Sequence, residues 1–488
     1  MRSIRRPSTA SRRQVLGRLG GALASLALAA CSPSIRTPVP PRATVTATSV
    51  PVQSPSPLAA PSAVATAEPT IVPTAAPPTS TATPVPRTII WWTERSDPAW
   101  LKAVAEAGRR FSAIHPEATV QSSGGHVDFG RTVGSIAIGL SPDLLETGSL
   151  GPLAARGVLR SLDPYLAGSQ VSPGNYEPTM WDNGRWNGTV QGIPALDHGP
   201  ELALFWNRSL AGDAIDPSHP PATWDELLRV GRSLTRKAAD GSLTLLGFDP
   251  LDGVGALLDT VRDLTGQPWL SSNGSQVQLA QPAYQQHLDS VLAYCLRIGV
   301  DHLNDFRMHN VALTADAASA VNQGKQAALL TGYWSVAEVE PFAKDHQYDF
   351  RAAWAPAHQS GLLPQRLGGR LLVVPSAAHG PGDGWELLEF LTTDDVNDLF
   401  LGLAGRFAAT RSYVSSGRWK RVAGLEFFLD SLSQATQLSA RSNNPIAGYA
   451  QVKWEQVLSD VLTKGKSSAE ALATAQATLQ VALGKAGG

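Results

Sequence analysis

The segment RTIIWWTERSDPAW (residues 87–100) decides the fold class, because a strand, a short loop and the start of a helix follow one another closely in it. The apolar run TIIWW is typical of a short buried strand. Asp97 is a suitable N-cap and Pro98 a suitable first helical residue. Apolar residues then recur at helical spacing as far as Ile114. We therefore predict a helix that ends before Pro116.

The same alternation continues along the chain. We predict strands in ATVQSS (118–123), SPDLLETG (141–148) and ELALFWNRSLA (201–211), and a helix over LGPLAARGVLRSL (150–162). Alternating strands and helices favour an α/β fold with mainly parallel sheets. In open sheets of this kind, ligands bind beyond the carboxyl ends of the strands. The loop 93–96 lies at such an end.

Length and charge limit the possible classes of protein. A chain of 488 residues exceeds the roughly 250–300 residues at which one hydrophobic core stops growing, so more than one lobe is expected. A formal net charge of −1 gives no electrostatic footprint for nucleic acid. The two cysteines lie in different contexts, and we expect no disulfide. Cys295, within VLAYCLRIG, is expected to be a buried small hydrophobic residue.

The N-terminus has the layout of a signal peptide, with arginines and no acid in residues 1–18 and an apolar run over 19–30. That run is about half of the roughly 20 residues needed to span a bilayer. SRRQVLG resembles the twin-arginine export motif. LAAC, ending at Cys31, resembles the bacterial lipobox, whose cysteine is lipidated and becomes the new N-terminus. A Sec signal with an incidental cysteine is the alternative.

Residues 32–87 are rich in Pro, Thr, Ser, Ala and Val, and they contain no Gly, Phe, Tyr or Trp. Such a tract cannot build a core and is typical of a semi-extended spacer. All tryptophans lie between Trp91 and Trp454, which marks the globular region. We therefore predict a signal peptide with lipobox over 1–31, a spacer over 32–87 and a folded head beyond.

The sequence lacks the usual signatures of catalysis: it contains no HExxH, CxxC, GxSxG or GxxxxGK[ST]. His302 and His309 do not have metal-ligand spacing. Glu94 and Asp97 are neighbours on one turn, whereas the two acids of a glycosidase face each other across a sugar. We expect no catalytic residue, no metal and no cofactor. A secreted carbohydrate-active enzyme that uses Glu94 remains an alternative.

The middle of the chain, GIPALDHGPELALFWNRSLAGDAIDPSHPPATWDELLRVGRSLT (192–235), resembles a signature of the extracellular solute-binding proteins of sugar-type ABC importers, the family that includes maltose-binding protein. A Gly-Ile-Pro strand, a strand end at 206–208 and a Thr-Trp-Asp-Glu-Leu helix start at 223–227 carry the likeness. Further segments follow in the family's order: PDLLETGSLGPLAARGVLRSLDPYL, QGKQAALLTGYWSV, RLGGRLLVVPSAAHGPGDGWELLEFLTTDDV and GRFAATRSYVSS. The resemblance runs from about residue 88 to the C-terminus.

The resemblance implies a two-lobe periplasmic-binding-protein-like fold of type II, with a ligand cleft that closes by a hinge motion. The implied lobes are discontinuous, with residues 88–198 plus 352–406 in lobe 1 and 199–351 plus 407–488 in lobe 2. The chain would cross between them near 197–201, 348–354 and 406–412.

The resemblance also implies a binding cleft in which rings pack on sugar faces and polar groups bind hydroxyls. The positions that match cleft-lining loops are Trp92, Glu94, His126, Ser149, His198, Tyr333, Trp334, Gly369 and Arg406. Because side chains alternate along a strand, at most one of Trp91 and Trp92 reaches the cleft. Arg406 stands where many relatives have Gly-x-x-Pro, which raises the hypothesis of an anionic or acid-substituted sugar.

These implications define the expected function. We expect a monomeric lipoprotein, anchored through Cys31 to the outer face of the cell membrane, that captures a carbohydrate or similar polar small molecule and delivers it to an ABC permease. A binding protein that feeds a sensor remains an alternative.

Overall fold

The computed structural model describes residues 85–126, 128–310 and 314–486. The predicted signal peptide, the predicted lipidation site Cys31 and all but the last residues of the predicted spacer lie outside the described residues. Among the described helices, none combines the length and the apolar character needed to cross a membrane.

A six-stranded sheet organises one half of the folded region, with strands from both its N-terminal and its C-terminal parts. The strand order is β13-β12-β3-β1-β2, with β6 also paired to β12. The strands are β1 (Arg87–Thr93), β2 (Ala118–Ser123), β3 (Leu144–Thr147), β6 (Ile193–Pro200), β12 (Pro364–Val373) and β13 (Gln437–Ala440). β1 runs parallel to β2 and β3, whereas β12 runs antiparallel to β3 and β6. The carboxyl ends of β1 and β3 therefore lie together at one edge of the sheet.

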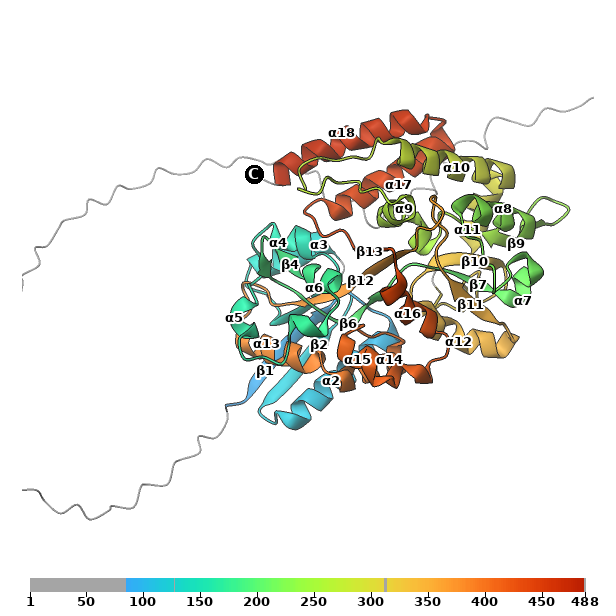
Figure 1. The fold of residues 1–488 in the computed structure, drawn as a ribbon. Helices are drawn as coiled ribbons and strands as arrows, with labels where there is room; N and C mark the ends of the chain where they lie inside the picture. The colour runs from blue at the N-terminus through green and yellow to red at the C-terminus, as the bar shows by residue number, and fades with distance from the viewer. Residues whose placement is uncertain (1–84, 127, 311–313, 487–488) are drawn as a thin grey trace, which may run out of the picture. The chain divides into compact units, whose positions relative to one another are not determined.

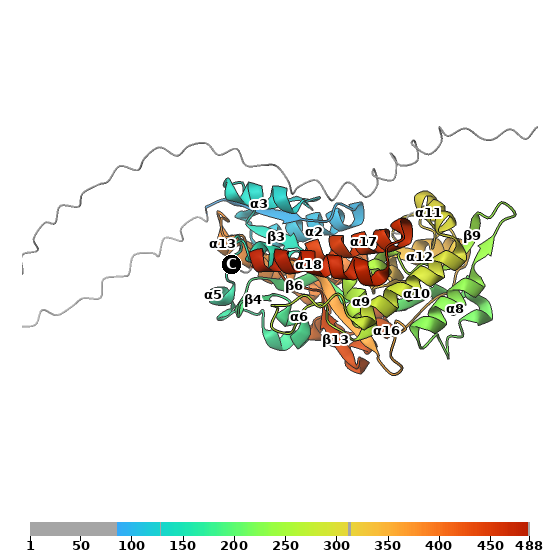
Figure 2. The ribbon, with the colours of Figure 1, turned by 90° about the horizontal axis from the view of Figure 1, so that it is seen from above.

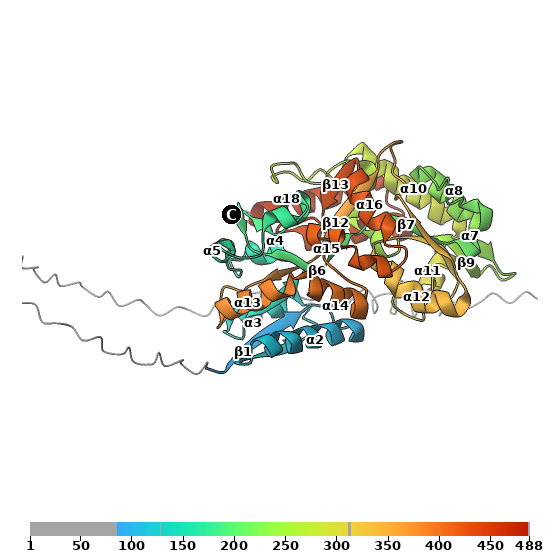
Figure 3. The same ribbon diagram turned by 60° about the horizontal axis from the view of Figure 1, so that its bottom comes forward.

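Three helices cover β1 and its neighbours (Figures 1 and 3): α2 (Pro98–Ile114), α13 (Pro381–Leu391) and α14 (Asp394–Ala404). Their apolar residues pack with the sheet into one core that includes Trp91, Trp100 and Trp385. Trp91 is fully buried, whereas its neighbour Trp92 is only partly buried. The predicted alternation along this strand is confirmed.

A five-stranded sheet organises the other half of the folded region, in the order β11-β7-β10-β9-β8. Its strands are β7 (Ala203–Asn207), β8 (Arg236–Lys237), β9 (Leu243–Phe248), β10 (Gln326–Thr331) and β11 (Phe350–Ala353). Helices α8 (Trp224–Leu234), α10 (Pro282–Ile298), α11 (Val300–His309) and α12 (Trp334–His346) belong to this half. A second core contains Trp206, Trp224 and Cys295, which are all buried, and the predicted burial of Cys295 is thereby confirmed.

The C-terminal helices α17 (Ala447–Lys464) and α18 (Ser468–Ala486) lie alongside each other and against α9 (Leu258–Thr265) and α10 (Figure 2). They share a third core with these helices. The other helices and short strands are α3 (Phe129–Ala137), α4 (Leu150–Ala154), α5 (Asp163–Leu166), α6 (Pro178–Asp182), β4 (Arg185–Trp186), β5 (Thr189–Val190), α7 (Arg208–Ala211), α15 (Arg411–Ser416) and α16 (Glu426–Gln434).

Local capping chemistry agrees with the sequence. The Asp97 carboxylate accepts a hydrogen bond from the Trp100 backbone amide at the start of α2, and Thr223 forms a capping box with Glu226 at the start of α8. The helix predicted over 150–162 is wrong, because α4 ends at Ala154. Gly157 then adopts a left-handed φ of 66°, a conformation that ends a helix.

The chain passes from the six-stranded to the five-stranded sheet through residues 201–202, between β6 and β7, and returns between β11 and β12. A third passage follows α14, where Ala408 forms a bridge to His198 of β6. The next residue, Ala409, lies in an apolar cluster with Phe205 of β7. The assignment of individual residues to two lobes stays a prediction.

Candidate functional site

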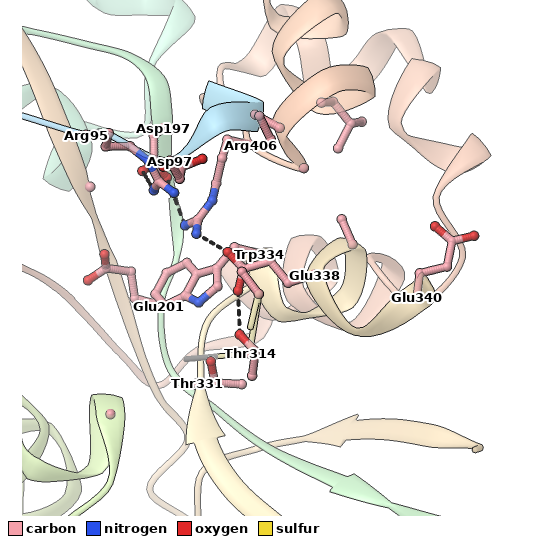
Figure 4. Close-up of a pocket in the computed structure, with 18 of the residues that line it drawn as sticks. Arg95, Asp97, Asp197, Glu201, Thr314, Thr331, Trp334, Glu338, Glu340 and Arg406 are labelled. Atoms are coloured by element: carbon pink, nitrogen blue, oxygen red, sulfur yellow. Dashed lines mark hydrogen bonds and ion pairs between the residues drawn. The ribbon is translucent and has the colours of Figure 1, made fainter. Parts of the chain in front are cut away.

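A cavity of about 960 Å³ lies between elements of both sheets (Figure 4). Its volume falls in the range of small-molecule sites. The residues that follow β1, together with those on β6 and β12, line one side, and the end of β10 with α12 lines the other. The polar and aromatic residues of the lining include Glu94, Arg95, Asp197, Trp334, Glu338, Arg370 and Arg406.

Asp197 is the centre of the polar wall. Its side chain is about 5% exposed and lies 3.2 Å from Arg95 Nη1 and 3.3 Å from Arg370 Nη1. The Tyr333 hydroxyl donates a 2.8 Å hydrogen bond to its Oδ1. Burial by itself would raise the pKa of Asp197, but the charges of Arg406, Arg95 and Arg370 outweigh burial and lower it. Asp197 is therefore ionised at neutral pH and holds three guanidinium groups in place.

Arg406 joins the two sides of the cavity. Its Nη1 lies 3.6 Å from Asp197 Oδ1 on β6, and its Nη2 pairs with the Glu338 carboxylate on α12. The guanidinium also lies over the Trp334 ring, 5.0 Å from the ring centroid. Thr314 donates to the same Glu338 carboxylate. The positive charge of Arg406 is thus matched by two carboxylates of the protein itself.

Glu94 is held rigidly at the end of β1. Its Oε1 accepts a 2.6 Å hydrogen bond from the Thr147 hydroxyl, and its Oε2 accepts from the Gly148 amide at 3.0 Å and from Arg370 Nε at 3.3 Å. Each of its oxygens already accepts a hydrogen bond from the protein, so this carboxylate is suited to fixed hydrogen bonding.

Trp92, His126 and Ser149 lie beside the main cavity. The Trp92 and His126 rings stack with centroids 4.1 Å apart and planes 4° apart. His126 and Ser149 line a small hollow that also contains Glu94. Glu94 therefore borders both spaces, and one face of Trp92 is already covered by His126.

His198 and Tyr333 are fully buried behind the cavity wall. Burial lowers the pKa of His198 to about 4, so the ring is neutral at physiological pH. Its Nδ1 lies 3.3 Å from the Arg370 carbonyl oxygen. The two residues support the wall, since Tyr333 binds Asp197 and His198 contacts the backbone of Arg370.

Gly369 lies in the cavity wall, where β12 pairs with His198 of β6. It has a φ of 143°, and a Cβ there would lie 1.8 Å from the Asp197 carbonyl oxygen. Only glycine fits such an approach. Of the nine positions that the resemblance implied, the structure brings Glu94, Trp334, Gly369 and Arg406 to the cavity, places Trp92, His126 and Ser149 beside it, and places His198 and Tyr333 behind it.

Nine charged lining residues were missing from the predicted positions, and four of them form the polar wall described above: Arg95, Asp197, Glu338 and Arg370. Arg95 and Arg370 directly follow the predicted Glu94 and Gly369. A prediction that also took the next residue after each of these positions would have found both arginines. Glu338 follows Trp334 by four residues and thus lies on the same face of α12. No group of ligating side chains suited to a metal ion occurs within the part of the chain that the structure describes.

Solved structures of sugar-binding proteins share this fold. CpMnBP1, solved with mannobiose bound, has a TM-score of 0.71 at 19% identity, and the match covers 80% of this chain and 98% of that one. An ABC transporter solute-binding protein from Thermotoga lettingae, bound to α-D-tagatose, has a TM-score of 0.66 at 18% identity, with 81% and 100% covered. The sugar-binding protein MalE from Xanthomonas citri has a TM-score of 0.65 at 20% identity, with 82% and 98% covered.

These matches confirm the two-lobe binding-protein fold that the resemblance implied. A comparison with curated proteins finds no match. The sequence model of the family described as "Bacterial extracellular solute-binding protein" matches residues 97–426, which is more than half of the chain. That family and the matching structures are solute-binding proteins and not enzymes. The chain belongs to the family of bacterial extracellular solute-binding proteins.

Proposed function

We propose that this protein captures a neutral carbohydrate, or a similar polyhydroxylated small molecule, and delivers it to the permease of an ABC importer. The observation that carries the proposal is the combination, in one cavity, of the Trp334 ring with the fixed acceptor Glu94 and the guanidinium of Arg370. A ring can pack on the C–H face of a sugar, while charged planar groups bind its hydroxyls. The sugars bound by CpMnBP1 and by the Thermotoga lettingae protein support this class of ligand.

The charge arrangement favours a neutral ligand over an anionic one. An anionic sugar would need a free guanidinium, yet Arg406 already pairs with Asp197 and Glu338. Arg95 and Arg370 are likewise paired with protein carboxylates. Displacing such a partner would leave a partly buried carboxylate without its counter-charge, which is costly. The pairing thus weakens the hypothesis of an acid-substituted sugar.

A thermal-shift screen tests the ligand class. We expect mannobiose, mannotriose, maltotriose or tagatose to raise the melting temperature, because a ligand at 100 times its Kd stabilises the folded state by about 2.7 kcal/mol. Glucuronate and galacturonate serve as anionic controls and should give no shift. Stabilisation by the acidic sugars alone, or turnover of a bound sugar, would contradict the proposal.

Anchoring is the second part of the proposal and depends on the LAAC motif and the spacer after it. A lipid on Cys31 would hold the folded head near the membrane, at the end of a semi-extended tether. We expect the wild-type protein in the membrane fraction and Cys31→Ser in the soluble or secreted fraction. Equal membrane association of the two proteins would exclude lipidation at this cysteine. Uptake of the bound sugar, lost on deletion of the gene, would distinguish transport from sensing.

A further inference from the structure

Glu146 is a buried carboxylate directly behind the binding cavity. It lies on β3, where its register partners are Thr93 of β1 and Leu372 of β12, and it has no exposed surface. The Thr93 hydroxyl donates to its Oε2. Its Oε1 has no hydrogen-bond partner among the described residues. An incompletely satisfied acid at such a position is costly and calls for an explanation.

Arg370 connects this buried acid to the cavity. Its Nε donates a 3.3 Å hydrogen bond to Glu94 Oε2 and lies 3.4 Å from Glu146 Oε1 without forming a hydrogen bond to it, so the two carboxylates compete for one guanidinium charge. Its Nη1 lies 3.3 Å from Asp197. A change in the charge of Glu146 must therefore alter how strongly Arg370 holds Glu94.

The charged groups around Glu146 come from three elements: Glu94 and Arg95 from the end of β1, Asp197 from β6 and Arg370 from β12. Helix α13 also packs against β3, but its acids Asp383 and Glu386 pair with Arg87 at the opposite end of β1, and its third acid, Glu389, accepts hydrogen bonds from residues 169 and 170. The surroundings of Glu146 thus contain two carboxylates and two guanidinium groups, all of which line the ligand cavity.

We propose that Glu146 is a positioning residue, which acts through Arg370 to set the place of the Glu94 carboxylate in the cavity. The inference rests on the proposed function only for its effect on ligand affinity. When Glu146 is neutral, Arg370 pairs with Glu94 and Asp197 only, and Glu94 keeps the position seen in the structure. An ionised Glu146 draws the Arg370 Nε–H toward itself and loosens Glu94.

The titration of Glu146 falls in the physiological range. Burial raises the pKa of Glu146 to about 7, with further increases from the charges of Glu94 and Asp197, while Arg370 and the Thr93 hydroxyl oppose the rise. The acid is therefore mostly protonated below pH 7 and mostly ionised above it. Affinity for a neutral sugar should accordingly fall as the pH rises through 7.

The ligand-free test observes Arg370 directly. In protein labelled with ¹⁵N-arginine, the Arg370 Nε–H resonance is assigned by its loss in Arg370→Lys. We expect it to shift with a midpoint near pH 7 in the wild type and to stay constant over that range in Glu146→Gln. A resonance that titrates equally in both proteins, or in neither, would overturn the proposal. This outcome does not depend on which sugar binds.

Thermal unfolding without ligand tests the ionisation independently. The folded-state pKa of about 7 lies above the ordinary value of 4.5, so the stability that Glu146 contributes is complete below pH 4.5 and is lost as the pH rises to 7. The melting temperature of Glu146→Gln should therefore rise relative to that of the wild type between pH 4.5 and 7. Glu455→Gln, on the exposed face of α17, is the control and should show no such change. If the difference in melting temperature between Glu146→Gln and the wild type stays constant from pH 4.5 to 7, Glu146 does not titrate as proposed.

Binding of mannotriose gives the functional readout. A coupling of one pKa unit between Glu146 and the ligand corresponds to about a tenfold change in affinity. We expect the Kd of the wild type to rise about tenfold from pH 6 to pH 8 and that of Glu146→Gln to remain at the low-pH value. If Glu146→Gln binds weakly at every pH, the ionised form is required and the proposal is wrong. If mannotriose and the other sugars fail to bind while the Arg370 resonance titrates as expected, the proposed function fails and the positioning role stands.

Discussion

Replacing Arg366 with methionine should lower the free energy of unfolding by about 3 kcal/mol. The side chain lies on β12 with no exposed surface. Its Nη1 lies 2.7 Å from Asp263 on α9, and its Nε lies 3.3 Å from Glu201, in the segment that leads to β7. Methionine fills a similar volume but leaves both carboxylates buried without this counter-charge. Removing one member of a buried ion pair typically costs about 3–5 kcal/mol.

The lower end of that range applies because both carboxylates keep a second partner. Glu201 still pairs with Arg441 at 2.7 Å, and Asp263 still pairs with Arg262 at 2.8 Å. Urea unfolding measures the loss as a decrease in the transition midpoint at constant slope. Arg351→Met is the matched control, since this arginine is about half exposed and its pair with Asp349 should contribute less than about 1 kcal/mol. If both variants lose the same small amount of unfolding free energy, the buried ion pairs of Arg366 are not needed for stability.

Local rules predicted the parts of the fold that depend on near neighbours. The cap at Asp97 and the alternation of Trp91 and Trp92 each need only a few consecutive residues. The order of strands and helices was sufficient for the α/β class, but the expectation of mainly parallel sheets was wrong, because β12 pairs antiparallel with β3 and β6 and β7 pairs antiparallel with β10 and β11. The helix predicted over 150–162 was wrong, because the prediction followed the apolar pattern and disregarded Gly157. The left-handed conformation of this glycine does not allow the helix to continue.

The polar wall of the cavity could not be predicted in this way, because its contacts join distant parts of the chain. Arg95 meets Asp197 across about a hundred residues, and Arg370 meets Glu94 across nearly three hundred. No local pattern encodes such pairs. The burial of Glu146 could not be predicted either, since a single acid within SPDLLETG is typical of the polar end of a strand. Its burial becomes apparent only when β1 and β12 lie on either side of it.

Trp334→Ala should weaken sugar binding at least about 30-fold, which corresponds to the roughly 2 kcal/mol typical of an aromatic residue at the centre of an interface. The ring is partly buried at the start of α12 and lines the cavity. Its position is closely constrained, because a Cβ on Gly332 would lie only 2.3 Å from the ring and Arg406 lies over it at 5.0 Å. A ring already held in place loses little conformational freedom when a ligand packs on it.

Isothermal titration calorimetry with mannotriose measures the loss, and Trp334→Phe should recover part of the affinity because it keeps an aromatic face. Trp354→Ala is the control: this tryptophan is also partly buried, but it packs on Phe427 and lines a different cavity of about 650 Å³. Its removal should leave the Kd within about twofold of the wild type, because the cavity that it lines shares no lining residue with the ligand cavity. Unchanged binding by Trp334→Ala, with a melting temperature close to that of the wild type, would mean that sugar packing occurs elsewhere. The Trp92 and His126 stack beside Glu94 would then be the next surface to test.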